Sequence, residues 1–526
     1  MIKYAARAAV STAILAGGCA LVVAVILAVA TASVVAVSAG GILAVLAAIA
    51  ALGMLAAVGF GLLGARRRRR KPLEGVAVTS DEQPLLWVEV CIVAETLGMR
   101  PPDELLLVPD AKVVASEGRA WLGLRPGVRR LQLGEVILAG LTERQLRAVI
   151  AHELLRCWGP ISFGRVIHSG RETIGRLIDV LGEDSRPGRI VGRYGRVYVA
   201  VSRPVVRRHQ LKADILSAGI AGNGATSAAL RDVAVLSKAW DGFVGTYVAP
   251  AVGVRRRPES LFAGFARFLE EPTRVAQLAE TLGEPEVQEL TYDSLQPLED
   301  RLVAIASLGD DNTHDRSGRS LDMLRKADRE IARVEDSMFQ DPDLIAATWE
   351  EIAPEAGRVA AREDALKLVR VGQDGGLGQR LSVATLLDLM RYGLVDEMVR
   401  PSLGADASPE LERQLASRLV TAFLATAAIE SGTVSHRLSW WAAPWRLVDA
   451  EGEDEVLPVL VDAALDDPDE VSALDLWLDT HQLGEEFELG EDSGPGSPQT
   501  LPGVLAESTD DPVKSPEQGA RPILVS

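Results

Sequence analysis

The sequence predicts a mostly helical α+β fold in four parts, on three observations. The chain begins with a long apolar run that carries no charge. Helical and strand-like patterns then alternate, and only helical patterns follow until a tail rich in proline, glycine and acidic residues. We therefore expect a transmembrane helical hairpin at 1–71, a mixed domain with a small sheet at 72–310, an all-α domain at 311–486 and a disordered tail at 487–526.

Bulk composition limits the classes of function. The chain has 526 residues, more than one hydrophobic core normally holds. Its formal net charge is -18, which argues against nucleic acid as a partner, because phosphate binding needs a basic surface. The cysteines Cys19, Cys91 and Cys157 have no spacing that suggests a disulfide framework, which suits a reducing compartment.

The N-terminal run at 8–65 has no charged residue. One span needs about 20 apolar residues, so the run is long enough for two, with a break at 38–41. Lys3 and Arg7 precede the run and the basic stretch at 66–71 follows it, so both flanks would stay in the cytoplasm. A signal peptide would be shorter. We expect a multi-pass protein of the inner or plasma membrane, with the lipid bilayer as a partner and cytoplasmic soluble domains.

The mixed domain is expected to begin with a helix and a strand. In the segment 82–99, an apolar stripe at helical spacing consists of Leu85, Val88, Ile92 and Leu97. The short apolar run at 104–110 ends at a proline, which is typical of a strand.

A hairpin and a second helix should follow. Two strand-like runs flank the turn residues at 125–127. The helix after them has a capping box, with Thr142 as N-cap and Gln145 at the third helical position. Leu141 and Leu146 fit a hydrophobic staple, and Gly159-Pro160 should end the helix.

This helix contains a His-Glu pair that resembles part of a zinc site. A catalytic zinc ion takes three protein ligands and a water molecule. Two histidines four residues apart on a helix can hold one ion, and a glutamate beside them can take a proton from the water. His152 would be a ligand and Glu153 the general base. The second histidine position holds Arg156, whose guanidinium has no acceptor atom and stays charged.

Several neighbouring residues extend the likeness. The phrase L-T-x-x-E-L-x-A-V-x-A-H-E-x-x-H, typical of one peptidase family, is matched by Leu141, Thr142, Leu146, Ala148, Val149, Ala151, His152 and Glu153. With the strand and hairpin before it, this stretch resembles the HtpX-like and CAAX-prenyl-protease metallopeptidases (metallopeptidase family forty-eight), over roughly residues 75–305. The resemblance implies a gluzincin-like domain and a zinc endopeptidase ancestry.

Two later motifs of that family are also altered. The family's third zinc ligand is a glutamate, and the matching position here is Gln210, with Asp214 at the motif's aspartate. Arg301 fits a third motif, whose histidine position is Leu295. Two of three implied ligands are therefore replaced, and we expect zinc to be absent or weakly bound. Arg156 could pair with Glu153 or Asp214. A rebuilt ligand set remains open and would come from His152, Cys157, His168 and His209.

The C-terminal third shows helical patterns from residue 320 onward and no catalytic signature. Trp440, Trp441 and Trp445 form a cluster in sequence, either as core or as a contact for a partner, and core packing is the more common reason. The histidines without clustered companions, which we expect at the surface, are His314, His436 and His481.

Three functions follow as hypotheses. The first is a membrane-anchored pseudo-peptidase of the metallopeptidase fold that binds proteins or peptides, along an edge strand for example. The second is an active HtpX-type zinc metalloendopeptidase in membrane-protein quality control, with Glu153 as base and His152 as ligand. The third is a scaffold that acts through its C-terminal helical domain. Zinc content separates the first two.

Overall fold

The computed structural model describes residues 75–120, 125–158, 174–175, 178, 186–281, 297–309, 315–377, 380–403, 408–441, 444–453, 456–484 and 486–490. The chain divides into two compact units, and both are discontinuous in sequence. Unit 1 comprises residues 1–238 and 275–338, and unit 2 comprises residues 239–274 and 339–526. The boundary predicted at residue 310 thus falls inside unit 1.

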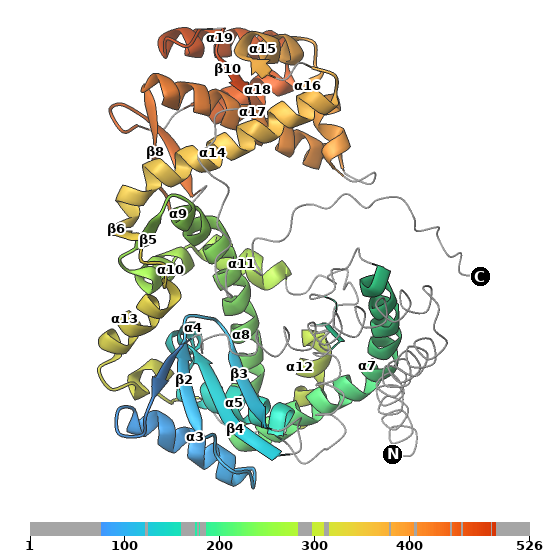
Figure 1. Cartoon of the computed structure of the whole chain (residues 1–526), viewed down its shortest axis with the longest axis vertical. Helices are drawn as coiled ribbons and strands as arrows, with labels where there is room; N and C mark the ends of the chain where they lie inside the picture. Colours follow the sequence, from blue (N-terminus) through green and yellow to red (C-terminus); the bar gives the residue numbers. More distant parts are fainter. Residues whose placement is uncertain are drawn as a thin grey trace, which may run out of the picture. The chain divides into compact units, whose positions relative to one another are not determined.

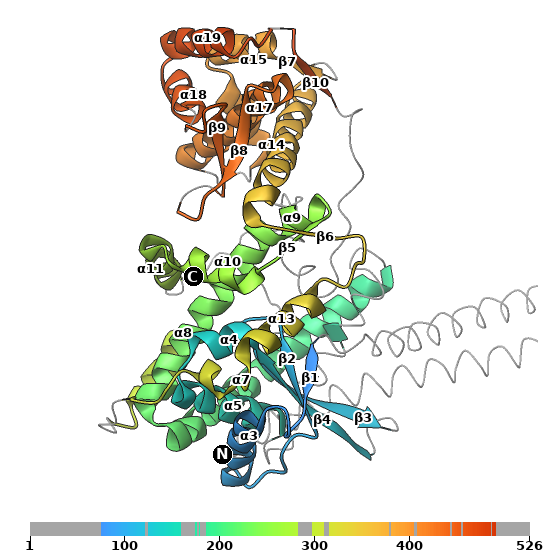
Figure 2. The same ribbon diagram turned by 90° about the vertical axis from the view of Figure 1, so that its left-hand side faces the viewer.

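Unit 1 contains a four-stranded sheet with the order β1-β2-β4-β3, beside α5 (Figures 1 and 2). Its strands are β1 (Val76–Val78), β2 (Glu104–Val108), β3 (Val113–Ala120) and β4 (Arg125–Gly134). β2 and β4 are parallel, and the other two pairs are antiparallel. The core side of the sheet is leucine-rich and includes Leu105, Leu107, Leu131 and Leu133. β1 and β3 are the edge strands.

The rest of unit 1 is mostly helical, and three of its helices carry the side chains of the candidate site. The helices of unit 1 are α3 (Pro84–Thr96), α4 (Glu135–Gly140), α5 (Glu143–Trp158), α7 (Arg186–Ala221), most of α8 (Asn223–Phe243), most of α11 (Pro272–Thr281), α12 (Leu298–Ala306) and α13 (Ala327–Met338), with a 3-10 turn η3 (Ser320–Met323). α7 packs along α5 and also contacts α12.

The predicted start of α5 is confirmed. The Thr142 backbone N–H donates to Gln145 Oε1 at 2.8 Å, and the Gln145 backbone N–H donates to Thr142 Oγ1 at 3.3 Å. Both leucines of the expected staple, Leu141 and Leu146, are buried. The segment after α12 also supports this helix end, because the Gly318 carbonyl accepts the Glu143 N–H at 2.9 Å.

The helix predicted within 82–99 and the paired strands after it are confirmed, with two local differences. The stripe on α3 faces solvent: Leu85, Val88 and Ile92 are 61%, 55% and 47% exposed, while Leu86 and Val90 on another face are fully buried. α3 is apolar on more than one face, so periodicity alone could not select the face that packs on the core. The residues expected as a turn, 125–127, are instead the start of β4. Most of the strand-like run after them continues β4, and only its end forms the helix α4.

Unit 2 is also mixed rather than all-α. Its helices are α9 (Ala249–Gly253), α10 (Leu261–Leu269), α14 (Trp349–Asp374), α15 (Val383–Arg391), α16 (Val395–Val399), α17 (Pro409–Ser431), α18 (Leu457–Asp466) and α19 (Val471–Thr480), with short turns η2 (Val244–Val248), η4 (Arg400–Ser402) and η5 (Pro468–Glu470). Three two-stranded sheets join β5 (Arg256–Pro258) to β6 (Ile345–Ala347), β7 (Arg380–Ser382) to β10 (Glu488–Gly490) and β8 (Val434–Leu438) to β9 (Trp445–Asp449).

Unit 2 holds two apolar groups. Helices α14 to α19 share one aliphatic core. A group of aromatic rings lies at the start of the unit, and its members are Trp240, Phe243, Tyr247, Phe262, Phe265, Phe268, Trp349, Trp440 and Trp445. Trp440 therefore belongs to the core, as the sequence favoured, whereas Trp441 is 60% exposed.

The predicted membrane hairpin must be corrected. Within the described part of the chain, no helix is both long and apolar enough to cross a bilayer. This finding contradicts the transmembrane element of the expected fold class and the expected multi-pass membrane location. The run at 8–65, on which both were based, lies outside the described residues, as does the tail after Gly490. The corrected fold class is a mostly helical α+β protein with small sheets.

Candidate functional site

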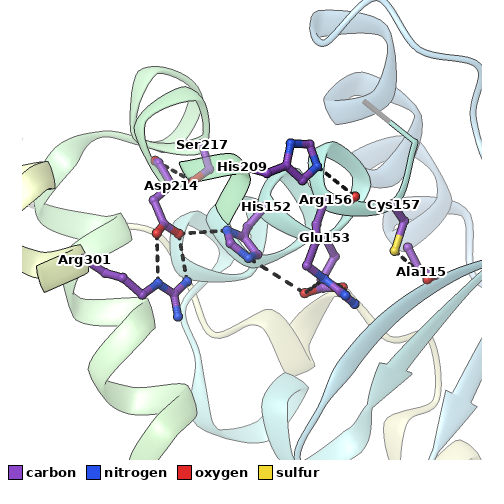
Figure 3. Close-up of polar contacts among 9 residues, drawn as sticks. All are labelled: Ala115, His152, Glu153, Arg156, Cys157, His209, Asp214, Ser217 and Arg301. Atoms are coloured by element: carbon purple, nitrogen blue, oxygen red, sulfur yellow. Dashed lines mark hydrogen bonds and ion pairs between the residues drawn. The ribbon is translucent and has the colours of Figure 1, made fainter. Parts of the chain in front are cut away.

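The candidate site lies in unit 1, where α5, α7, α12 and β3 meet (Figure 3). α5 supplies His152, Glu153 and Arg156, because residues at these spacings lie close together on one side of a helix. α7 supplies Asp214, and α12 supplies Arg301. Three of the predicted motifs, far apart in the sequence, are thus brought together.

Asp214 is the buried centre of one half of the site. Its carboxylate has no exposed surface and accepts two hydrogen bonds of 2.8 Å from Arg301, through Nε and Nη2. His152 Nδ1 lies 2.8 Å from Asp214 Oδ1. Burial raises the pKa of Asp214, but the contacts with Arg301 and His152 outweigh it and hold the pKa below its usual value. Asp214 therefore carries a negative charge that fixes two other side chains.

His152 is buried and oriented by this contact. Its Nδ1 side faces Asp214, and its Nε2 lies 4.0 Å from Glu153 Oε1 (Figure 3). In metal sites, a ligating histidine commonly gives its second ring nitrogen to a carboxylate, which fixes the ring. His152 has the same arrangement. Its Nδ1 faces the Asp214 carboxylate, and its Nε2 is the ring nitrogen that would bind an ion.

Arg156 occupies the other half of the site. Its Nε lies 3.1 Å from both carboxylate oxygens of Glu153, and its Nη2 lies 2.7 Å from Oε2. Burial raises the pKa of Glu153, but the charges of Arg156 and His152 and the hydrogen bonds from Arg156 and the Ala115 backbone lower it below its usual value. Glu153 is ionised and both of its oxygens are engaged.

These donors do not fit a zinc ion. A guanidinium places a positive charge where the second nitrogen ligand is needed, and it offers no lone pair. Glu153 is already bound by that guanidinium and is not available to take a proton from water. Within the described residues, no three histidine, cysteine, aspartate or glutamate side chains are arranged to hold a metal ion.

The other proposed ligands have different contacts. His209 is buried, and its Nε2 lies 3.2 Å from the backbone carbonyl oxygen of Arg156, so the ring can donate to the end of α5. The Cys157 thiol donates to the Ala115 carbonyl at 2.9 Å. Gln210 is buried one turn before Asp214 on α7. His168 and Leu295 lie outside the described residues.

Sequence reasoning missed the role of β3 in this site. The Ala115 backbone N–H donates to Glu153, and its carbonyl accepts from Cys157. Both contacts come from α5 to the edge strand of the sheet. No side-chain motif marks Ala115, so only the fold reveals the contact.

Two of the remaining histidines are less exposed than predicted. His436 is 8% exposed, and burial lowers its pKa to about 4. His481 is half-buried, and its ring centroid lies 4.2 Å from that of Trp477. His314 lies outside the described residues.

Comparison of the chain with known protein families, curated proteins and solved structures finds no match. The likeness to the metallopeptidases therefore depends on the quoted motifs and on the geometry of the residues that they contain.

Proposed function

We propose that this protein is a metallopeptidase-like pseudo-peptidase that binds proteins or peptides without cleaving them. One observation carries the proposal: Arg156 engages both carboxylate oxygens of Glu153, at 2.7 to 3.1 Å. The arginine stands at the position of a metal ligand and simultaneously engages Glu153, the candidate base. A single ion pair thus removes two requirements of the zinc reaction.

The rest of the site supports descent from a metal site. His152 is still oriented through Nδ1 by a buried carboxylate, and that carboxylate is itself fixed by Arg301. Such supporting contacts normally position a ligand. These contacts are retained, although the other two ligand positions hold Arg156 and Gln210. This combination favours a protein that keeps the peptidase fold and binds polypeptides but does not cleave them.

Metal content and peptidase activity test this proposal. We would purify the wild type and an Arg156→His/Gln210→Glu variant, measure zinc per chain, and follow cleavage of unfolded casein. The wild type should hold no stoichiometric zinc and should leave casein intact. The variant restores an imidazole and a carboxylate at the two altered positions, and it should bind zinc through His152 as the third ligand.

A matched control adds His152→Ala to the same two changes. This triple variant should lose the zinc that the double variant gains, because it removes the ligand that Asp214 orients. Stoichiometric zinc in the wild type, together with casein cleavage that Glu153→Gln abolishes, would instead establish an active zinc endopeptidase and refute the proposal.

A further inference from the structure

One helix in this acidic protein is strongly basic. α7 contains eight basic residues and one acidic residue, Asp214, although the whole chain has a net charge of -18. Five of its arginines, which we term the arginine stripe, are Arg189, Arg193, Arg196, Arg203 and Arg207. They follow steps of four, three, seven and four residues, so they lie on one face of the helix.

The opposite face of α7 is apolar and packed. Tyr198 and Val205 are buried, and they form a cluster with Ile174 and Ile178. These two positions lie about half a helical turn away from the stripe. The helix is therefore amphipathic, with its apolar face against the protein and its arginines on the other side.

The outer part of the stripe has no described counterion. Arg189, Arg193 and Arg196 are exposed, and none of them makes a hydrogen bond or ion pair with another described residue. Further along, Arg207 is half-buried, and its Nε is buried without a hydrogen-bond partner among the described residues. A buried donor without an acceptor is unfavourable, so an anionic ligand that reached it would be stabilised.

The stripe descends from the surface toward the candidate site. Its outer arginines are exposed and its inner ones half-buried, and the same spacing continues to Gln210 and Asp214, which are buried. A flat bilayer or a rigid nucleic-acid duplex would contact only the outer, exposed arginines of the stripe. An extended polypeptide with carboxylate side chains can follow it, because arginine binds carboxylates well and a single chain is narrow.

We propose that the arginine stripe binds an extended acidic segment of a partner protein. This inference rests on the proposed binding function and gives the chemistry of the partner. From Arg189 to Arg207 the stripe covers 18 residue steps of helix, about 27 Å, which is the length of about eight extended residues. The edge strand beside the site is a poorer place for the same segment, since Ala115 already uses its N–H and carbonyl within the protein.

The test is a titration of the full-length protein with a fluorescent peptide of alternating glutamate and serine, followed by anisotropy at an ionic strength of about 0.15 M, where the Debye length is about 8 Å. Arg193→Glu should weaken binding about tenfold, because it removes one attraction and adds one repulsion. The matched control is Lys212→Glu, the same charge change on an exposed residue of α7 that lies off the stripe. It should change the affinity less than about twofold, since long-range charge effects are screened.

Three outcomes would overturn the inference. The first is an equal loss in both variants, which indicates a diffuse field. The second is no difference between the glutamate peptide and a matched glutamine peptide. The third is tighter binding of a single-stranded oligonucleotide or of phosphatidylserine vesicles through Arg193, which assigns the stripe to phosphate groups. None of these results changes the zinc measurements, so failure here is distinguishable from failure of the proposed function.

Discussion

At the scale of single residues, Arg156 has the largest consequence for the proposed function. The sequence places an arginine one helical turn after His152, but only the structure assigns its guanidinium to Glu153 rather than to Asp214, which Arg301 and His152 already engage. The sequence could predict which residues meet here, because they lie in recognisable motifs. It could not predict how the charges pair, since this depends on distances between three helices.

Loss of this ion pair should destabilise unit 1. Arg156→Met leaves the carboxylate of Glu153 buried without its cation, and we expect the free energy of unfolding to fall by about 2 kcal/mol. The double variant Arg156→Met/Glu153→Gln removes the charge as well and should recover at least half of that loss. Urea unfolding checks both. An unchanged stability in Arg156→Met would mean that the pair contributes little to folding.

Glu135 is a second residue at this scale, and its ionisation affects the stability of the folded protein. It is 2% exposed, and neither carboxylate oxygen has a hydrogen-bond partner among the described residues. Burial and the nearby Glu335 and Glu330 raise its pKa from 4.5 to about 8. The folded protein therefore holds a proton that the unfolded chain releases above pH 4.5, so stability is lost as the pH rises through this range.

Glu135→Gln should remove this dependence. Relative to the wild type, the variant should gain stability from pH 5 to pH 8, by about 2 kcal/mol at the upper end, because it cannot ionise. Unfolding by urea at both pH values measures the difference. A difference that stays constant with pH would show that Glu135 titrates normally in the folded protein.

At the scale of elements, helix α14 and strand β8 make an unusually close contact. A Cβ added at Gly357 would lie 2.4 Å from Cγ of His436, so the glycine is required by the ring above it. Gly357→Ala should lower the free energy of unfolding of unit 2 by about 2 kcal/mol through overpacking. Gly242→Ala, in helix α8 with nothing within 4 Å, should be neutral or stabilising. Thermal unfolding of both variants checks the contrast, and equal effects would contradict it.

The same contact makes unit 2 sensitive to acid. The pKa of His436 falls from 6.5 to about 4 through burial, so the folded unit binds the proton less readily than the unfolded chain. Stability is complete above about pH 6.5 and is lost as the pH falls toward 4. Between pH 7 and pH 4.5, His436→Asn should lose about 2 kcal/mol less than the wild type. Identical pH dependence in the two proteins would exclude this group as the cause.

Elements also show where sequence patterns succeed. Local signals predicted the start of α5 correctly, because a capping box is made by residues three apart. The exposed stripe of α3 was not predictable in the same way. Leu85, Val88 and Ile92 have the correct helical spacing, but the helix carries apolar residues on its other faces too, and tertiary contacts decide which face is buried.

At the scale of the whole molecule, the two units are interleaved in sequence. Residues 239–274 belong to unit 2, and the chain then returns to unit 1 before entering unit 2 again at Phe339. Composition could not reveal this, because helices α8 and α11 run unbroken across the first two crossings. The predicted domains follow the sequence in order, whereas the packing of Tyr247 against Trp440 and Trp445 joins distant segments.

Truncation after Met338 should therefore fail to give a well-behaved protein. It removes Trp349, Trp440 and Trp445 and leaves their partners in residues 239–274 uncovered. We expect low soluble yield and strong binding of the dye ANS compared with the full-length chain. A monomeric truncated protein that does not bind the dye would show that the aromatic residues of 239–274 can pack without the later segments.

The contacts of Ala115 have a consequence for aggregation rather than for ligand binding. An edge strand normally offers free backbone groups to the edges of other chains, and such pairing is a common start of aggregation. On β3, Glu153 and Cys157 occupy both backbone groups of one residue in the middle of the edge. These two side chains shield that part of the strand, so variants that release them should favour sheet growth between molecules.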